Sequence, residues 1–199
     1  AIHPSDADVV YASGNNHNDS LGRGGIYKTL DGGLNWQKVL HRDSVKGINK
    51  IYMNPVNHDI LYAYTETGEN KKRIRIYKTE NGGDDWELIM NGLPKSEKIN
   101  DIGMAVATSK SNVVYSLIKH KVPSEDTSKK EETKIHIFRS DDYGDNWTQT
   151  GEQKVDFGFM VMEVSPDNAD EIYLGSVHVW RSTDQGETLN RIADSVFHI

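Results

Sequence analysis

Two acidic residues are placed where a hydrolytic enzyme could use them. Asp101 and Asp156 each stand near the start of a repeated unit of the chain. Glycosidases need two carboxyl groups at a set separation across the cleft, one to protonate the leaving oxygen and one to act as base or nucleophile. Both residues also suit turns, so the sequence offers them as catalytic candidates and as turn residues alike.

Other catalytic or metal chemistry finds little support in the residue types. The chain holds eight histidines and no cysteine, which excludes a disulfide framework, a thiolate metal site and a cysteine nucleophile. His178 and His198 are the histidines expected to be neighbours, and no further ligand accompanies them. No glycine-rich loop follows a strand and opens a helix, as a phosphate-binding loop would. We therefore expect no metal site and no cofactor.

Two polar segments are candidates for binding rather than catalysis. The amide-rich stretch 13–25 suits sugar hydroxyls or a peptide, and the basic run 71–73 suits an anionic partner. Either segment could equally be a solvated loop, because a charge run usually lies on a solvated face. The candidate ligand-binding residues are Asn15, Asn16, His17, Asn18, Arg23, Lys71, Lys72 and Arg73.

The overall composition narrows the class of partner. Of the 199 residues, 36% are hydrophobic and 27% are charged, and the formal net charge is −7. This acidic balance argues against a general nucleic-acid binder and against binding to an anionic membrane. The uninterrupted apolar stretches are only a few residues long, so the sequence predicts no membrane-spanning helix. A protein, a peptide or a glycan is the expected partner.

A turn motif that recurs four times sets the architecture. A hydroxyl residue is followed by Asp or Asn two positions later, by Gly four positions later, and by Trp or Leu seven positions later. Glycine adopts a positive φ without steric cost and the Asx side chain accepts hydrogen bonds from turn amides, so each copy predicts a tight hairpin turn. Because the four turns belong to four units, their acids cannot meet at one substrate. The residues of these structural turns are Thr29, Asp31, Gly33 and Trp36; Thr79, Asn81, Gly83 and Trp86; Ser140, Asp142, Gly144 and Trp147; and Ser182, Asp184 and Gly186.

Short apolar runs separated by turn signals fill the rest of each unit. A tyrosine-centred run lies upstream of every turn motif, and a further apolar run precedes most of these. Short strands at regular spacing are typical of an all-β fold, and their repetition with a period near 50 residues is typical of propeller blades. We predict a β-propeller of four blades with four antiparallel strands each, at about residues 1–45, 46–94, 95–153 and 154–194.

The two ends of the chain suggest that this propeller is larger. Residues 195–199 have the pattern of the start of an axial strand, and residues 1–4 have that of the end of one. Two arrangements fit: both ends are cuts through a longer propeller, or they meet and close a ring of four blades. We adopt the first, which makes the remaining blades of the same propeller the expected neighbours.

Length variation concentrates in the connections between the second and third strands. These connections cover about residues 13–25, 65–75, 119–134 and 175–178. Repeat proteins usually bind through the face that carries such variable loops. The connection 119–134 is rich in Lys, Glu, Ser and Thr, so it is predicted to be disordered.

The four turn motifs match the Asp-box, or BNR, repeat, Ser/Thr-x-Asp-x-Gly-x-x-Trp. Families with this repeat include sialidases, xyloglucanases, a photosystem assembly factor and sortilin-type receptors. The fuller pattern, with residues 2–12, 103–107 and 180–186, most resembles the large bacterial sortilin-like proteins often labelled BNR-repeat glycosyl hydrolases. The resemblance covers nearly the whole chain and implies a propeller fold. It says less about activity, because propellers host unrelated functions.

Departures from these families prevent any transfer of active-site residues. Sialidases carry an Arg-Ile-Pro motif, whereas Arg73 and Ile74 are followed here by Arg75. Eukaryotic sortilins add a cysteine-rich module, and this chain has no cysteine. The catalytic aspartates of xyloglucanases find no matching motif.

Three functions therefore stay open. The first is an extracytoplasmic, bacterial-type interaction domain, secreted, periplasmic or at the cell surface, that binds a protein, peptide or glycan through its variable-loop face. The second is a glycoside hydrolase acting on polysaccharide, and the third is a structural part of a surface or secretion assembly. We expect the first.

Overall fold

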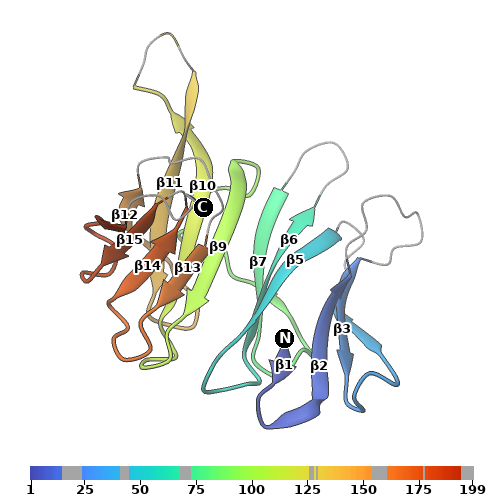
Figure 1. Ribbon diagram of the computed structural model, residues 1–199. Helices are drawn as coiled ribbons and strands as arrows, with labels where there is room; N and C mark the ends of the chain where they lie inside the picture. Colours follow the sequence, from blue (N-terminus) through green and yellow to red (C-terminus); the bar gives the residue numbers. More distant parts are fainter. Residues whose placement is uncertain are drawn as a thin grey trace, which may run out of the picture. The chain divides into compact units, whose positions relative to one another are not determined.

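The computed structural model describes residues 1–14, 24–40, 45–67, 73–125, 128, 130–153, 161–176 and 178–193. These residues form four antiparallel sheets of four strands each and no helix, as Figure 1 shows. The predicted all-β class, with four blades of four antiparallel strands, is confirmed. None of the helices that a membrane span would require occurs in the described ranges.

The chain divides into two compact units, Ala1–Ile89 and Met90–Ile199. Within each sheet the strands follow one another in chain order, so each sheet is a simple up-and-down meander. In the first unit the strands are β1 (Ile2–His3), β2 (Asp6–Gly14), β3 (Gly25–Thr29) and β4 (Gln37–Leu40), then β5 (Val45–Met53), β6 (Leu61–Thr67), β7 (Arg73–Thr79) and β8 (Glu87–Leu88). In the second unit they are β9 (Ile99–Val106), β10 (Val114–Pro123), β11 (Glu131–Ser140) and β12 (Thr148–Gln153), then β13 (Val161–Val164), β14 (Ile172–Gly175), β15 (Val179–Ser182) and β16 (Asn190–Ala193).

Each unit has a hydrophobic core that both of its sheets build. Tyr11 and Ile26 of the first sheet pack with Leu61, Tyr77 and Trp86 of the second. In the second unit, the cluster contains side chains of β9, β10 and β11 together with side chains of β13 and β14. Because strand side chains alternate between faces, each sheet can contribute one face to a shared core. Burial of these apolar side chains is the main force that stacks the sheets.

The turn between the first two strands of a sheet lies beside the Asp-box turn between its last two strands. One backbone hydrogen bond joins the two turns in every sheet, with N···O distances of 2.9–3.1 Å. The donor is the residue directly before the box glycine, and the acceptor is the carbonyl three residues before the strand-two tyrosine. These bonds are Gly32 to Asp8, Gly82 to Asp59, Tyr143 to Asn112 and Gln185 to Asp170. The variable connection between the second and third strands therefore leaves from the opposite end of each sheet.

The expectation of disorder between residues 119 and 134 is wrong for most of that segment. β10 and β11 pair residue by residue from Val114 opposite Ser140 to Pro123 opposite Glu131. The low apolar content misled the prediction, because pairing here is stabilised by the backbone ladder and by cross-strand contacts of polar side chains. The segment is a β-hairpin that extends the third sheet, visible at the top of Figure 1.

Candidate functional site

The β10–β11 hairpin is the largest described element at the variable-loop end of the third sheet. β9 pairs with β10 only as far as His120, and β12 pairs with β11 only as far as Ile135. Within the described residues, the stretches Lys121–Pro123 and Glu131–Lys134 therefore run beyond both outer strands. On the β10 side, the Lys121 N–H donates to the carbonyl oxygen of Lys98 at 3.0 Å, and Pro123 has no N–H. On the β11 side, no described strand of this sheet covers the outer edge at Glu131–Lys134.

Two histidines and a glutamate form a chain of contacts at the base of this hairpin. His120 Nε2 lies 2.7 Å from His136 Nδ1, and His136 Nε2 lies 3.3 Å from Glu152 Oε2. Both histidines are buried, with exposed fractions of 7% and 8%. One proton arrangement satisfies all three groups: Glu152 accepts from His136 Nε2–H, and His136 Nδ1 accepts from His120 Nε2–H.

The surroundings of these contacts favour a neutral His120 and an ionised Glu152. Burial lowers the pKa of His120, and the charge on His136 lowers it further, while a backbone hydrogen bond with Lys121 opposes the shift. Burial alone would raise the pKa of Glu152, but hydrogen bonds from Lys134 and His136 bring it below its usual value. Lys134 Nζ lies 3.3 Å from Glu152 Oε1. These contacts therefore hold the side chains that connect β10, β11 and β12 in fixed positions.

The His120–His136–Glu152 chain has the order of a proton relay but is too deeply covered for one. A general base must reach the proton that it abstracts, and His120 and His136 are both buried. Within the described ranges, no three His, Asp or Glu side chains are grouped as a metal site requires. We therefore infer that the contacts among these three side chains position the hairpin and take no part in a reaction.

The tip of the hairpin carries alternating charges. Lys98 Nζ pairs with Glu131 Oε1, and Lys134 Nζ lies 3.7 Å from Glu132 Oε1. The hydrogen bond from Lys98 lowers the pKa of Glu131, which keeps this carboxylate ionised. Lys121 is exposed on the facing strand. The hairpin thus presents a polar, mixed-charge surface above a fixed base.

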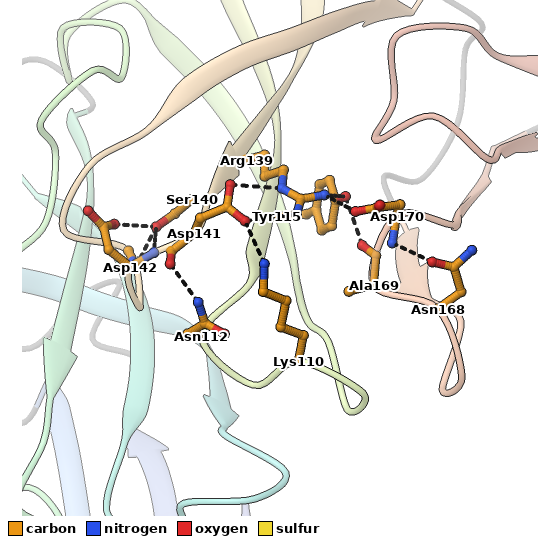
Figure 2. Close-up of polar contacts among 11 residues, drawn as sticks. Lys110, Asn112, Tyr115, Arg139, Ser140, Asp141, Asp142, Asn168, Ala169 and Asp170 are labelled. Carbon is orange, nitrogen blue, oxygen red and sulfur yellow. Dashed lines mark hydrogen bonds and ion pairs between the residues drawn. The ribbon is translucent and has the colours of Figure 1, made fainter.

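A second polar network lies at the opposite, Asp-box end of the second unit. Arg139 is 6% exposed and donates to both carboxylate oxygens of Asp141, at 3.0 and 2.8 Å. Its Nη1 also donates to Tyr115 Oη at 2.7 Å and to Asp170 Oδ1 at 2.5 Å. Tyr115 Oη in turn donates to the carbonyl oxygen of Ala169 at 2.9 Å. Figure 2 shows that this network joins β10 and β11 to the turn that precedes β14.

The surroundings of this network keep Tyr115 protonated, Arg139 positively charged and Asp141 ionised. Burial raises the pKa of Tyr115 to about 12, although the charge of Arg139 opposes the shift. Burial would lower the pKa of Arg139, but hydrogen bonds to Asp141 and Asp170 raise it above its usual value. The hydrogen bond from Arg139 lowers the pKa of Asp141, so the acid stays charged. Tyr115 therefore remains a donor and Arg139 remains a cation throughout the physiological range.

The side chains of each Asp box form hydrogen bonds within their own turn. The Thr29 hydroxyl donates to Asp31 Oδ1 at 2.7 Å and accepts from the Gly33 N–H at 3.0 Å, while Asn35 N–H donates to Asp31 Oδ1 at 2.8 Å. The same three bonds occur at Thr79 and Asn81, at Ser140 and Asp142, and at Ser182 and Asp184. The glycines four residues after the box hydroxyl, which include Gly144, have φ between 91° and 98°, a region that side chains with a Cβ rarely adopt. The indole Nε1 of Trp36 donates back to Gly33 O, and that of Trp86 to Gly83 O. Trp147 is 5% exposed.

The remaining predicted site residues are placed only in part. Asp101 lies on β9, is exposed, and accepts from the N–H of Ile102 at 2.9 Å. Arg73 begins β7. The other candidates lie outside the described residues: Asn15, Asn16, His17, Asn18, Arg23, Lys71, Lys72 and Asp156. His178 is described and its expected neighbour His198 is not.

Sequence reasoning missed the two networks described above. His120 and His136 are 16 residues apart and become neighbours only through the hairpin register, which places His136 opposite Ile118 and His120 opposite Lys134. A repeated signal for the second network was present. A cation stands directly before each box hydroxyl, and the register places it opposite the strand-two tyrosine in every sheet. These cross-strand pairs are Tyr11 with Lys28, Tyr62 with Lys78, Tyr115 with Arg139 and Tyr173 with Arg181.

Comparison with solved structures identifies the fold. The GH74 enzyme of Niastella koreensis is 17% identical with a TM-score of 0.63, and an ancestral GH74 enzyme is 19% identical with a TM-score of 0.64. The chain is covered to 96% in both cases but spans only 28% and 23% of those two proteins. A protein of unknown function from Dyadobacter fermentans is 16% identical, with a TM-score of 0.56 over 90% of this chain and 60% of that one. At these identities the similarity shows the fold, that of β-propeller blades.

Sequence comparison supplies the family. No curated protein matches the chain. A family match covers residues 24–173, which is well over half of the chain and includes three of the four Asp boxes. The resemblance to sortilin-like Asp-box propellers is thereby confirmed. The chain belongs to the Sortilin-Vps10 family, described as sortilin, neurotensin receptor 3.

Proposed function

We propose that this chain is an interaction domain that binds an extended peptide segment of a protein partner at its variable-loop face. The observation that carries the proposal is the β10–β11 hairpin, whose β11 edge at Glu131–Lys134 runs beyond β12. An uncovered strand edge offers backbone donors and acceptors to which an extended peptide can add as a further strand.

The hairpin is held in place before any partner arrives, which favours binding. His120 and His136 connect β10 to β11, and Glu152 connects both to β12. A binding element that is already ordered loses less conformational entropy on association. The family description names a receptor, neurotensin receptor 3, which agrees with a binding function.

The charges at the tip favour a peptide of mixed charge. Lys121 is exposed on β10, while Glu131 and Glu132 lie on β11 within a few residues of it in register. Charged groups at the rim of an interface steer association and fix register more than they add affinity. The preferred peptide therefore carries at least one acidic and one basic residue.

A peptide array and a glycan array, both probed with the labelled 199-residue chain, test the proposal. We expect binding to a subset of peptides and a loss of about fivefold to tenfold in affinity for Lys121→Glu. The control is Lys110→Glu, which reverses an exposed charge in the turn between β9 and β10, at the far end of the same sheet. Equal losses in both variants, or binding to glycans alone, would overturn the peptide proposal.

The glycoside hydrolase alternative is tested with the same protein. A glycosidase acid needs a carboxyl group whose pKa is raised. Among the described residues, the carboxyl groups with a shifted pKa, which include Asp31, Glu131, Asp141 and Glu152, all have it lowered. Release of reducing sugar from polysaccharides, abolished by Asp101→Asn, would replace the binding proposal by the enzymatic one. Failure of every array and of hydrolysis would favour a structural part of an assembly.

We propose an extracytoplasmic location on the family assignment alone. Fractionation of the source cells, followed by detection with an antibody against this chain, tests it. Recovery in the cytoplasmic fraction would contradict the proposal.

A further inference from the structure

Two places in the chain carry asparagine directly before glycine, Asn81–Gly82 and Asn91–Gly92. This order is chemically reactive, because glycine has no side chain to hinder its main-chain nitrogen as that nitrogen approaches the neighbouring side-chain amide. The rate of the reaction depends on how firmly the fold holds the amide and the nitrogen. The two pairs are held very differently.

Asn81 and Gly82 are both engaged in hydrogen bonds at the second Asp box. Asn81 Oδ1 accepts from the Thr79 hydroxyl and from the Asp85 N–H, both at 2.9 Å. The Gly82 N–H donates to the carbonyl oxygen of Asp59 at 2.9 Å. The nitrogen that would have to attack is therefore bound, and the amide is fixed in place. These three bonds must open before the two groups can react.

Asn91 and Gly92 lie in an exposed turn that follows β8. The Leu93 N–H donates to the carbonyl oxygen of Met90 at 3.1 Å, and Gly92 has a φ of 90°, as in a type II turn. The Gly92 N–H has no acceptor among the residues that the structure describes. Exposed turns open at a low cost in free energy, so this nitrogen can reach the amide far more easily than that of Gly82.

The fold requires both residues of this second pair. A Cβ on Gly92 would lie 2.0 Å from the carbonyl oxygen of Trp147, so glycine alone fits there. Asn91 Nδ2 donates to Asn146 Oδ1 at 2.5 Å, and the carbonyl oxygen of Asn91 accepts from the Trp147 N–H at 2.9 Å. The reactive pair is therefore part of the contact that supports the third Asp box.

We propose that Asn91 is a site of spontaneous deamidation, and that its conversion to aspartate or isoaspartate weakens the third Asp box. The main-chain nitrogen of Gly92 bonds to Cγ of Asn91, the Cγ–Nδ2 bond breaks, and ammonia leaves with the proton that the Gly92 nitrogen gives up. Water then opens the cyclic imide and returns a proton to that nitrogen. Attack at Cγ gives aspartate, and attack at the main-chain carbonyl carbon gives isoaspartate. Water is the only co-reactant, and no group is oxidised or reduced.

Either product removes the donor from which Asn146 accepts. Asn146 Nδ2 donates to Asp142 Oδ2 at 2.7 Å, which fixes the orientation of its amide and directs Oδ1 toward position 91. A carboxylate at position 91 would therefore face another acceptor, and a hydrogen bond would be lost. Isoaspartate also lengthens the main chain at the residue whose carbonyl oxygen accepts from Trp147. The site is separate from the β10–β11 hairpin that we propose for peptide binding.

Peptide mapping of the folded 199-residue chain, aged at mildly alkaline pH, tests the site. Mass spectrometry detects the loss of the amide, and chromatography separates isoaspartate from aspartate. We expect both products to accumulate at position 91 at least about tenfold faster than at position 81, where several hydrogen bonds must open first. The control is the same chain unfolded in urea, in which the two pairs should react at similar rates. Equal rates in the folded chain, or faster loss at Asn81, would overturn the proposal.

Asn91→Asp tests the effect on the third Asp box directly. We expect a lower urea midpoint for the second unit and faster hydrogen exchange at the Trp147 N–H. Asn168→Asp is the matched control, since it adds the same charge to an exposed turn of the second unit. There Oδ1 accepts from the Asp170 N–H at 3.0 Å, which a carboxylate can also do. An Asn91→Asp variant as stable as Asn168→Asp would overturn the proposed effect on the box.

Discussion

The hydroxyl of Tyr11 donates a buried 2.8 Å hydrogen bond to the carbonyl oxygen of Gly82, which lies 71 residues further along the chain. Burial raises the pKa of Tyr11 to about 12, and the charges of Asp59 and Asp84 add to the shift. The hydroxyl therefore stays protonated and remains a donor at any physiological pH. This single bond connects the second strand of one blade to the Asp-box turn of the next.

Removing this hydroxyl should lower the stability of the first unit. We expect Tyr11→Phe to lower the free energy of unfolding by about 1–2 kcal/mol, because the carbonyl of Gly82 loses a partner in a buried place. Urea unfolding, followed by hydrogen exchange on peptides from residues 1–89, measures the effect. Tyr143→Phe is the control, since it removes a tyrosine hydroxyl from the second unit and keeps an aromatic side chain at its positive φ. Unchanged protection in the first unit would show that the bond contributes nothing.

Asp31 should make the first Asp box sensitive to acid. The backbone N–H of Asn35, the Thr29 hydroxyl and the Asn35 side chain donate to its carboxylate and lower its pKa to about 2. The unfolded chain takes up this proton near the usual value of 3.8. Stability that is present above pH 4 is therefore lost as the pH falls from about 4 to 2.

Asp31→Asn tests this dependence with a residue that the fold already accepts, since Asn81 occupies the same place in the second box. We expect the variant to unfold with a shallower dependence on pH between about 4.5 and 2.5, measured as the urea midpoint of the first unit. Asp167→Asn removes an exposed carboxylate from a turn of the second unit and is the matched control. Identical pH profiles for Asp31→Asn and the parent chain would contradict the role given to Asp31.

Strong local signals explain why the four sheets could be predicted from sequence. Thr29, Asp31 and Gly33 specify a turn whose hydrogen bonds are all local, and the same pattern recurs three more times. Tertiary neighbours were much harder to predict. The contact between His120 and His136 depends on the register of a hairpin whose polar composition suggested disorder. The bond from Arg139 to Asp170 depends on how one sheet packs on the next, which no spacing within a single repeat reveals.

His120 should make the stability of the hairpin depend on pH near neutrality. Burial lowers its pKa in the folded state, with the charge on His136 as the second cause. The unfolded chain binds this proton near the usual value of 6.5, so stability is full above that pH and is lost as the pH falls below it. The slope for one proton cannot exceed about 1.4 kcal/mol per pH unit. The shift of Glu152, which faces the same pair, acts at lower pH, below its usual value of 4.5.

We expect His120→Gln to flatten the pH dependence of unfolding of the second unit between about pH 7.5 and 5. Urea midpoints at half-unit steps of pH measure it, with hydrogen exchange on residues 114–140 as the local reading. His58→Gln, in a turn of the first unit against His3, is the control and should leave that profile unchanged. A parent chain whose second unit is equally stable at both ends of this pH range would rule out this role for His120.

Two glycines of the second unit should differ sharply in their tolerance of a methyl group. A Cβ on Gly151 would overlap the carbonyl oxygen of Gly186, which belongs to the Asp-box turn of the next sheet. Because the obstructing atoms are backbone, the third and fourth sheets can accept alanine only by moving apart. We expect Gly151→Ala to cost about 3 kcal/mol or more, with hydrogen exchange rising first in β13–β16. Gly175→Ala is the matched control: its Cβ would meet Val161 Cβ at 3.6 Å, an ordinary contact, so its cost should stay within about 1 kcal/mol. Equal stability of the two variants would show that the third and fourth sheets are not packed as closely as Gly151 and Gly186 require.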